Sequence, residues 1–345
     1  MKFVIIPRPD FFLFLEGLKE AGAVHGPQKK ENLFVFGPVE SAEEIAWDYI
    51  PTFLPPKKYL LPQRENLLAF APFDQNGSVP AEPPAPKVIL GLHTCDLAAF
   101  QCLDLCQKDK PEDPYYLANK GSLLLLGIEC LHKCDRYSNC VSMGTYLVKG
   151  GHDLMFTDLG DRFMVQVGTN SGQAILEKTK GWQNASQGDL ERLEAVRKKK
   201  IAEAREELDI ARDLIPEVFE WTPVDSPVWK DVGRRCIACC NCTNVCPTCY
   251  CFDVRDEVSL DLKKGIRYRV WDSCQSEEFA QIAHGINFRK ERSMRQRHRY
   301  YRKFKYSVDK YSEFFCIGCG RCTRTCMAAI SLIETVNQLA ADYRR

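Results

Sequence analysis

The chain has 345 residues, of which 45% are hydrophobic and 27% charged, with a formal net charge of +1. These proportions are ordinary for a folded globular protein and exclude a wholly disordered chain. No apolar run approaches the ~18 residues of a membrane-spanning helix. Arg8 and Asp10 also interrupt the apolar N-terminal stretch that a signal peptide would require. We therefore expect a cytoplasmic protein without a membrane span.

The 18 cysteines are the unusual feature of the composition. Their share lies below the ~8–10% that marks a small disulfide scaffold. A reducing cytosol keeps thiols free, so a cysteine-rich cytosolic chain more often binds metal or takes part in redox chemistry. The composition alone therefore indicates a metalloprotein.

Residues 1–225 have the pattern of a mixed α/β (α+β) domain. Short apolar runs, mostly bounded by Gly, Pro or Asp, predict strands at Phe3–Ile6, Leu33–Phe36, Val88–Leu92, Leu123–Ile128, Leu154–Thr157 and Phe163–Val167. A proline-rich stretch at residues 80–86 predicts an exposed connection between two of them.

Two helices complete this part of the chain. A helix over Asp96–Cys106 lies between two predicted strands and makes a β-α-β unit, which places those strands parallel with their carboxyl ends on one edge. A longer helix is predicted over Asp189–Leu214, with Pro216 ending it. The segment Thr222–Pro227 then marks the boundary with a second domain, residues 226–345.

One short motif recurs in the second domain. Cysteines with the spacing C-x2-C-x2-C-x3-C, the bacterial ferredoxin pattern for [4Fe–4S] clusters, occur twice. In two-cluster ferredoxins the first three cysteines of a motif hold one cluster and the fourth ligates the other. Zinc also accepts four thiolates, but it requires no third and fourth cysteine at these offsets. We expect one cluster on Cys236, Cys239, Cys242 and Cys326, and another on Cys316, Cys319, Cys322 and Cys246.

A second set of cysteines follows the β-α-β unit. Cys95 comes just after the first strand, at a helix N-terminus, which favours the thiolate. Cys130 comes just after the second strand, so both cysteines should lie on the sheet edge where α/β proteins bind ligands. Cys134 and Cys140 follow in the next loop and can fold over that edge. A third iron–sulfur cluster is the preferred interpretation, with zinc and buried free thiols as alternatives.

With these motifs in view, the chain resembles the beta subunit of cytoplasmic sulfhydrogenases and the iron–sulfur A subunit of anaerobic sulfite reductases. The matching stretches are Cys246–Cys251, Trp271–Cys274, His284–Arg289, His93–Leu97, Cys140–Thr145 and Asp153–Gly172. The resemblance implies an electron-transfer subunit of anaerobic metabolism. Its partners would be a flavin- and NAD(P)H-binding reductase subunit, or ferredoxin, and a catalytic redox subunit of hydrogenase or sulfite-reductase type.

Three further cysteines, Cys249, Cys251 and Cys274, match that family as well. Three thiolates could hold a cluster with one open iron site, or the thiols could be inert neighbours of the other clusters. The sequence leaves these two interpretations open.

A basic segment separates the two cysteine motifs. Residues 289–305 contain nine Lys or Arg and one acid, Glu291, with Tyr300, Tyr301 and Phe304 interleaved. Such a pattern can bind nucleic acid through phosphate contacts and base stacking. Its position favours a different role, since nearby cations stabilise anionic clusters and can dock an acidic electron carrier. We expect no nucleic-acid partner.

The sequence lacks several common active-site motifs. It contains no G-x-G-x-x-G fingerprint and no Walker loop, and its six histidines show no ligand or triad spacing. We therefore identify no independent catalytic site. The sequence predicts an iron–sulfur electron-transfer subunit of a multi-subunit oxidoreductase, with an α/β domain followed by a mainly helical ferredoxin-like domain. A regulatory or nucleic-acid-binding iron–sulfur protein and a self-contained iron–sulfur reductase are the alternatives.

Overall fold

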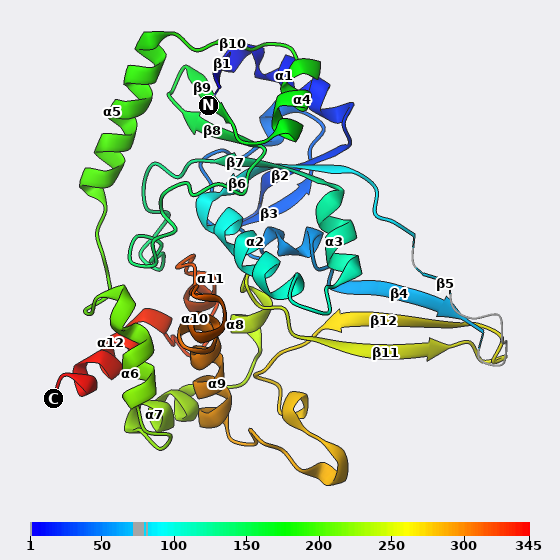
Figure 1. Ribbon diagram of the computed structural model, residues 1–345, viewed down its shortest axis with the longest axis vertical. Helices are drawn as coiled ribbons and strands as arrows, with labels where there is room; N and C mark the ends of the chain where they lie inside the picture. The colour runs from blue at the N-terminus through cyan, green and yellow to red at the C-terminus, as the bar shows by residue number, and fades with distance from the viewer. Residues whose placement is uncertain (1, 72–78, 81) are drawn as a thin grey trace.

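The computed structural model describes residues 2–71, 79–80 and 82–345, and a sheet of eight strands dominates its upper half (Figure 1). The strand order is β10-β1-β9-β8-β7-β6-β2-β3. The strands are β1 (Phe3–Pro7), β2 (Ala23–Lys30), β3 (Leu33–Pro38), β6 (Lys87–His93), β7 (Leu123–Ile128), β8 (Leu154–Asp158), β9 (Arg162–Val167) and β10 (Gln183–Asn184). All six strands predicted from the sequence are present.

The centre of this sheet is parallel. β2, β6, β7 and β8 pair in parallel, and α2 (Thr94–Gln107) connects β6 to the next part of the chain. The predicted β-α-β unit is therefore confirmed. His93 pairs with Ile128 at the carboxyl ends of β6 and β7. As a result, the residues that follow these two strands begin side by side on one edge of the sheet.

Helices cover both faces of the sheet. Side chains alternate along a strand, so Val88 and Leu90 of β6 face one core while Ile89 faces the other. An irregularity between Leu90 and Leu92 turns Leu92 toward the second core as well. The first core includes apolar residues of α1 (Phe11–Lys19) and α4 (Asn170–Lys178), and the second includes those of α2 and α3 (Pro114–Gly121). This burial on two faces explains why β6 and β7 are almost continuously apolar.

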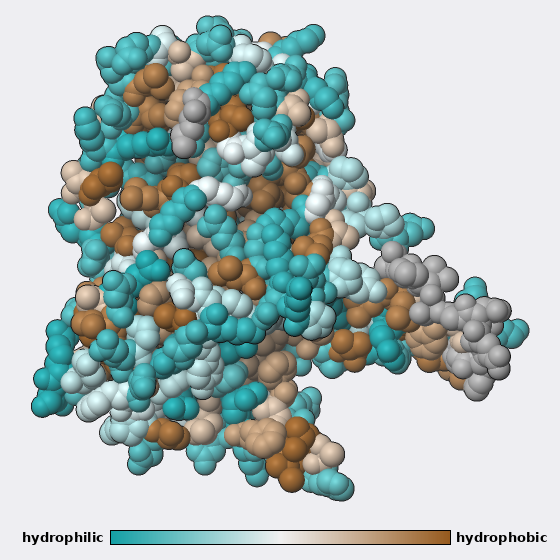
Figure 2. Space-filling view, viewed as in Figure 1, coloured by the Kyte–Doolittle hydropathy of each residue, from teal (hydrophilic) through white to brown (hydrophobic). Residues whose placement is uncertain are grey.

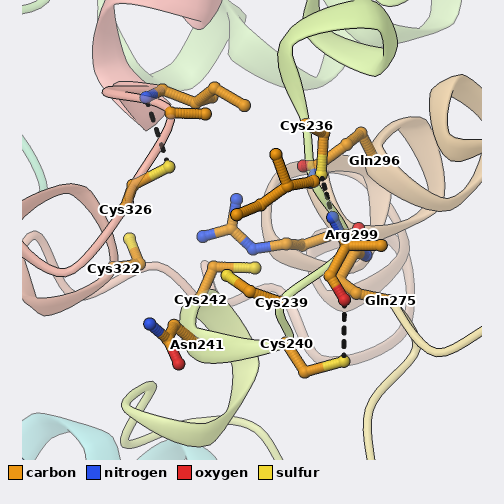
Figure 3. A pocket seen from close by; sticks show the side chains of 14 residues that line it. Cys236, Cys239, Cys240, Asn241, Cys242, Gln275, Gln296, Arg299, Cys322 and Cys326 are labelled. Carbon is orange, nitrogen blue, oxygen red and sulfur yellow. Dashed lines mark hydrogen bonds between the residues drawn. The ribbon is translucent and has the colours of Figure 1, made fainter.

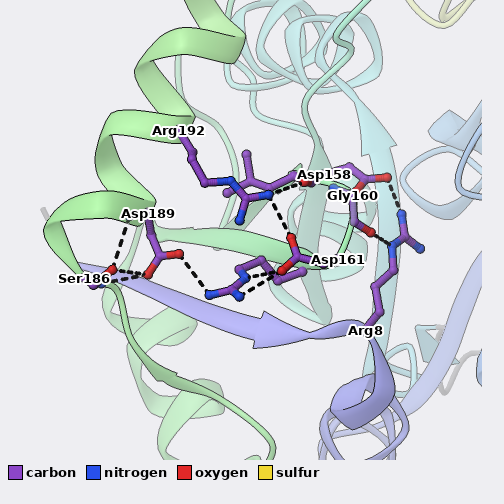
Figure 4. A network of polar contacts seen from close by, with 9 residues as sticks. Arg8, Asp158, Gly160, Asp161, Ser186, Asp189 and Arg192 are labelled. Atoms are coloured by element: carbon purple, nitrogen blue, oxygen red, sulfur yellow. Dashed lines mark hydrogen bonds and ion pairs between the residues drawn. The ribbon is translucent and has the colours of Figure 1, made fainter.

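Ion pairs connect the first turns of α5 (Gln187–Glu203) to the turn between β8 and β9 and to the start of β9 (Figure 4). Ser186 and Asp189 form a capping box at the start of the helix, as S/T-x-x-acid sequences do. Arg162 donates to Asp189 over 3.1 Å, and Arg192 donates to Asp161 over 2.8 Å. These contacts fix where α5 begins.

The prediction for the end of this helix is wrong. The helix stops at Glu203, and Ala204 already has extended backbone. Leu208 and Ile210, which continue the apolar periodicity, pack instead against the core of the C-terminal helices. Pro216 starts α6 (Ile215–Trp221) rather than ending the preceding helix, which agrees with the preference of proline for the first helical turn.

A second, four-stranded sheet joins the two halves of the chain. Its strands β11 (Phe252–Val258), β12 (Gly265–Trp271), β4 (Arg64–Phe70) and β5 (Val79–Pro80) are antiparallel. The buried side chain of Arg269 on β12 donates to Glu65 of β4 over 2.6 Å and also contacts Asp113. The hairpin β11–β12 of the second half thus continues a sheet that the first half begins.

The remaining helices pack below the large sheet (Figure 1). They are α7 (Pro227–Arg235), α8 (Asn241–Asn244), α9 (Arg292–Phe304), α10 (Tyr306–Tyr311), α11 (Arg321–Arg324) and α12 (Leu332–Tyr343). Short 3-10 helices occur along the whole chain, at η1 (Arg8–Asp10), η2 (Ala42–Glu44), η3 (Pro56–Tyr59), η4 (Arg212–Leu214), η5 (Glu278–Ala280) and η6 (Ala283–Gly285). Trp229, Tyr300 and Phe304 are among the largest buried side chains of their shared core. Residues 226–345 thus combine helices with the hairpin β11–β12.

Polar and apolar residues are interspersed over the visible surface, and one apolar group lies at the lower projection in Figure 2. Ile282, Ile286 and Phe288 are exposed in this part of the chain, Phe288 by 66%. Within the described residues, no helix has both the length and the hydropathy to cross a membrane.

Candidate metal centres

The two cysteine motifs fold alike. Each ends in a single-turn helix, α8 or α11, preceded by a residue with a left-handed backbone. The first motif places Ala238 and Cys240 at φ of 56° and 66°, and the second places Gly318 and Gly320 at 68° and 71°. The repeated backbone turns let cysteines close together in sequence line one small space.

One pocket is lined by three cysteines of the first motif, by the neighbouring Cys240, and by Cys322 and Cys326 of the second motif. Cys236, Cys239 and Cys242 lie on one side of this pocket and Cys326 on the other (Figure 3). Arg299 extends into the space between them. The structure therefore brings together the four cysteines that the sequence assigned to one cluster.

Nitrogen donors point at the sulfur atoms of this pocket. Gln296 donates to Cys236 Sγ over 3.0 Å, and the backbone N–H of Ile330 donates to Cys326 Sγ over 3.3 Å. Hydrogen bonds to cluster sulfurs favour the more reduced, more negative state and so raise the reduction potential. The pocket thus has donors suited to thiolate ligands.

A second pocket combines three cysteines of the second motif with one cysteine of the first. Cys316, Cys319 and Cys322 of the second motif line it together with Cys246, the last cysteine of the first. Lys303 also lines it, and its Nζ lies 2.6 Å from Thr248 Oγ1, which is itself 3.3 Å from Cys246 Sγ. Cys322 and Arg299 line both pockets, so the two sites are adjacent.

Burial opposes the loss of a proton from two thiols, one in each pocket. It raises the pKa of Cys242 to about 12 and that of Cys319 to about 11, although Arg299 and Arg321 act in the opposite direction. Burial also acts to lower the pKa of Arg299, but Cys242 and Cys322 hold it well above its usual value. A metal centre that binds here must displace the thiol protons.

One face of the basic helix α9 borders the pockets, since Arg299 lines both of them and Lys303 lines the second. Arg295, Arg299 and Lys303 follow one another at intervals of four residues and are about 95% buried. Side chains with this spacing share one helix face. The basic segment predicted from the sequence is therefore partly an internal wall of the cysteine pockets.

The N-terminal cysteines meet at the edge of the large sheet. Ligand atoms of His93, Cys130 and Cys134 lie within 4.8 Å of one another, as do those of His93, Cys95 and Asp96. The hydrogen bond from Cys134 holds the pKa of the Cys130 thiol well below its usual value. Burial, and then Cys130, raise the pKa of Cys140 to about 12, so this fourth thiol faces the group as well.

Sequence reasoning missed His93 as a candidate ligand. Its ring is buried and stacks on Tyr49 with the centroids 3.9 Å apart, and Nδ1 has no hydrogen-bond partner within the described part of the chain. No spacing rule connects His93 to Cys130. Only the register between β6 and β7 brings them together, so the signal lay in the predicted parallel pairing.

The N-terminal site touches the second motif. The buried Arg321 donates two hydrogen bonds to Asp96, of 2.7 and 3.0 Å. The backbone N–H of Asn139 donates to Gly318 over 2.6 Å, and a Cβ on Gly318 would lie 2.3 Å from Asn139 oxygen. The sites therefore follow one another in the order N-terminal set, second pocket, first pocket.

Two cysteines on α2 lie outside these groups. Burial raises the pKa of Cys102 to about 12 and that of Cys106 to about 11. Cys102 donates to the carbonyl of Phe314 over 3.6 Å and packs in a small apolar core. Both residues behave as the core thiols that their helical spacing predicts.

Comparisons with known proteins agree with the chemistry of the pockets. A family model described as a 4Fe-4S dicluster domain matches residues 235–330, which include all eight cysteines of the two motifs. The chain is 31% identical over 340 residues to the Sulfhydrogenase 2 subunit beta of Pyrococcus furiosus, with 98% of each chain covered. No solved structure matches the chain significantly. The protein is thus an iron–sulfur electron-transfer subunit and belongs to the sulfhydrogenase beta subunit family.

Proposed function

We propose that the chain relays single electrons inside a multi-subunit oxidoreductase, between a flavoprotein subunit or ferredoxin and a catalytic redox subunit. The observation that carries this proposal is the pair of adjacent pockets, each lined by three cysteines of one motif and the fourth of the other. When bound there, iron–sulfur clusters supply reversible one-electron chemistry. The chain supplies thiolates, N–H donors and buried cations.

For the ligands, we propose two [4Fe–4S] clusters with exchanged fourth cysteines. One set is Cys236, Cys239, Cys242 and Cys326, and the other is Cys316, Cys319, Cys322 and Cys246. In support, each set lines a single pocket. Because Arg299 and Cys322 border both pockets, an electron would travel only a short distance between the two sites.

We further propose a third iron–sulfur cluster on Cys95, Cys130, Cys134 and Cys140. In support, Cys130 and Cys134 each lie close to His93, Cys95 also lies close to His93, and Cys130 acts electrostatically on Cys140. This group lies next to the second motif. A centre at this place would extend the relay from the second pocket into the α/β half of the chain, residues 1–225. The other half, residues 226–345, would hold the other two clusters.

For the partners, we propose a flavin- and NAD(P)H-binding subunit and a catalytic subunit of hydrogenase or sulfite-reductase type. The family relative is named as a sulfhydrogenase subunit, which supports an assembly of redox subunits. We propose the cytoplasm as the location, because none of the 18 cysteines, all of which lie in the described residues, forms a disulfide, as a reducing compartment allows.

The experiment that tests this function compares electron donors. The isolated chain, prepared anaerobically, should be brown and should bleach with dithionite but not with NADH or NADPH. Adding a flavoprotein partner should make NAD(P)H an effective donor. Rapid reduction of the flavin-free chain by NADH would contradict the relay, and stoichiometric zinc without iron would contradict the clusters.

A further inference from the structure

A third thiol-lined cavity lies beside the second pocket and belongs to none of the sites above. It has a volume of about 260 Å³, against about 20 and 30 Å³ for the two pockets of the paired motifs. Cys249, Cys251 and Cys274 line it. Arg299, Lys303 and Phe315 border both this cavity and the second pocket.

Cations surround this cavity without acidic partners. Lys57, Arg299 and Lys303 are buried, and among the described residues none forms an ion pair with a carboxylate. Lys57 Nζ donates to the carbonyl oxygen of Cys249 over 2.7 Å, and Lys303 Nζ donates to the neutral hydroxyl of Thr248. A buried charge without a counter-ion is costly. A cluster in the second pocket or in this cavity would offset the charges of Arg299 and Lys303, which border both.

The walls of the cavity suit a soft, anionic group. Aromatic side chains line it, and the guanidinium of Arg302 lies 4.7 Å from the ring centroid of Tyr250. Cys274 is buried, and its Sγ accepts a hydrogen bond of 3.4 Å from Gln275 Nε2. Cys236 in the first pocket receives the same kind of side-chain amide donor, from Gln296.

The three thiols are not gathered as closely as the ligands of a single bound metal ion. With Zn–S bonds of ~2.3 Å, two ligands of a tetrahedral ion lie ~3.8 Å apart. Within the described ranges, Cys249, Cys251 and Cys274 do not form a group of ligand atoms that all lie within 4.8 Å of one another. The cysteines of the two ferredoxin motifs do not form such a group either. Wider spacing suits a cubane, whose irons occupy separate corners.

We propose that this cavity holds a further iron–sulfur cluster, ligated by Cys249, Cys251 and Cys274, with one iron that no cysteine ligates. Three thiolates around a space with a cationic wall match the soft ligands and the negative charge of such a cluster. The large volume leaves room for a small external ligand at the open iron. The centre would lie beside the second pocket and exchange electrons with it.

The first test uses the full-length chain in which Cys249, Cys251 and Cys274 are all replaced by Ala. Iron and acid-labile sulfide are measured after anaerobic preparation. The variant should lose about four irons and four sulfides relative to the natural chain, since each cubane holds four of each. The control, Cys102→Ala with Cys106→Ala, removes two buried thiols outside the cavity and should keep the full content. Unchanged iron in the triple variant would overturn the proposal.

A second test is needed because Cys249 is close to Cys246, so that replacing it can also remove iron from the second pocket. Electron paramagnetic resonance (EPR) spectra of the reduced natural chain are recorded with and without cyanide, which binds an open iron. One signal should change on adding cyanide, and this response should be absent in Cys274→Ala while the remaining signals persist. No response in the natural chain would overturn the proposal. Absence of every iron signal would instead contradict the two clusters of the proposed function.

Discussion

The ferredoxin motifs and the N-terminal cysteines both bring thiols together, but different structural features do so in each region. In the motifs, spacing along the chain and left-handed backbone at positions such as Gly318 and Gly320 bring the cysteines into one pocket. At the sheet edge, Cys95 and Cys130 are 35 positions apart and meet because β6 and β7 pair in parallel. The first kind of site depends on local sequence for three of its four cysteines, and the second depends on a correctly formed sheet.

This difference decides which substitutions affect which site. Changes within a motif should act on one pocket, whereas changes in the sheet register or in the contacts around Asp96 should act on the N-terminal site first. The Arg321–Asp96 pair connects the two regions, so its loss should affect both.

The largest expected effect separates the two regions directly. Replacing Cys95 and Cys130 by Ala should remove about four irons per chain and leave the EPR signals of the two motif clusters in place. Iron and zinc analysis of the purified protein measures this. Because His93, Cys130 and Cys134 form a compact group, loss of one zinc instead of four irons would identify a single metal ion at this edge. Full retention of metal would show that these thiols are only core residues.

The next effect concerns the connection between the regions. Arg321→Met leaves the buried carboxylate of Asp96 without its partner, which typically costs about 3–5 kcal/mol of unfolding free energy. Denaturant unfolding under anaerobic conditions measures this cost. Arg321→Met combined with Asp96→Leu should recover part of the loss, since no charge then stays buried alone. An unchanged midpoint in the single variant would show that the pair does not stabilise the fold.

Arg267→Met supplies the matched control for that measurement. Arg267 makes a two-bond ion pair with Asp256 in the hairpin, with both bonds 2.7 Å long, but both side chains are more than 40% exposed. Exposed pairs of this kind contribute little, because water screens them. A loss as large as that of Arg321→Met would show that burial does not set the energy of these pairs.

The smallest effect tests the local geometry of the second motif. Gly320 has φ of 71°, and a Cβ there would lie 2.5 Å from the carbonyl oxygen of Tyr137. Gly320→Ala should cost ~1–2 kcal/mol for the left-handed backbone alone, with an additional cost for the contact. Gly121→Ala, where a Cβ would meet nothing within 4 Å, is the control. The melting temperatures of the two variants are measured by thermal unfolding. Equal stability of the two would contradict the strain expected at Gly320.

The sequence predicted those features that depend on short-range patterns. The apolar runs located six strands, and the cysteine spacing identified the two motifs. It missed β2, because this strand contains Gly26, Pro27 and two lysines, which are uncommon in strands. Pairing with β3 and β6 on its two sides forms the strand nevertheless. It also could not pair β12 with β4, which are about 200 residues apart and are joined through the buried Arg269.

The site residues that the sequence did not predict also depend on contacts between distant parts of the chain. His93 and Lys57 lie far from the motifs in sequence and reach the metal centres only through tertiary contacts. The helix over 189–214 was overextended because Leu208 and Ile210 fit its periodicity while packing in another core. Periodicity reports that a residue is buried, but not which core buries it.

The exchange of fourth cysteines between the motifs is the central claim, and one measurement tests it most directly. EPR-monitored redox titrations are compared for four variants, Cys236→Ala, Cys326→Ala, Cys316→Ala and Cys246→Ala. The account predicts that Cys326→Ala removes or alters the same signal as Cys236→Ala, and that Cys246→Ala acts on the same signal as Cys316→Ala. If Cys246→Ala instead acted on the signal that Cys236→Ala removes, each motif would hold its own cluster, and the exchanged arrangement would be wrong.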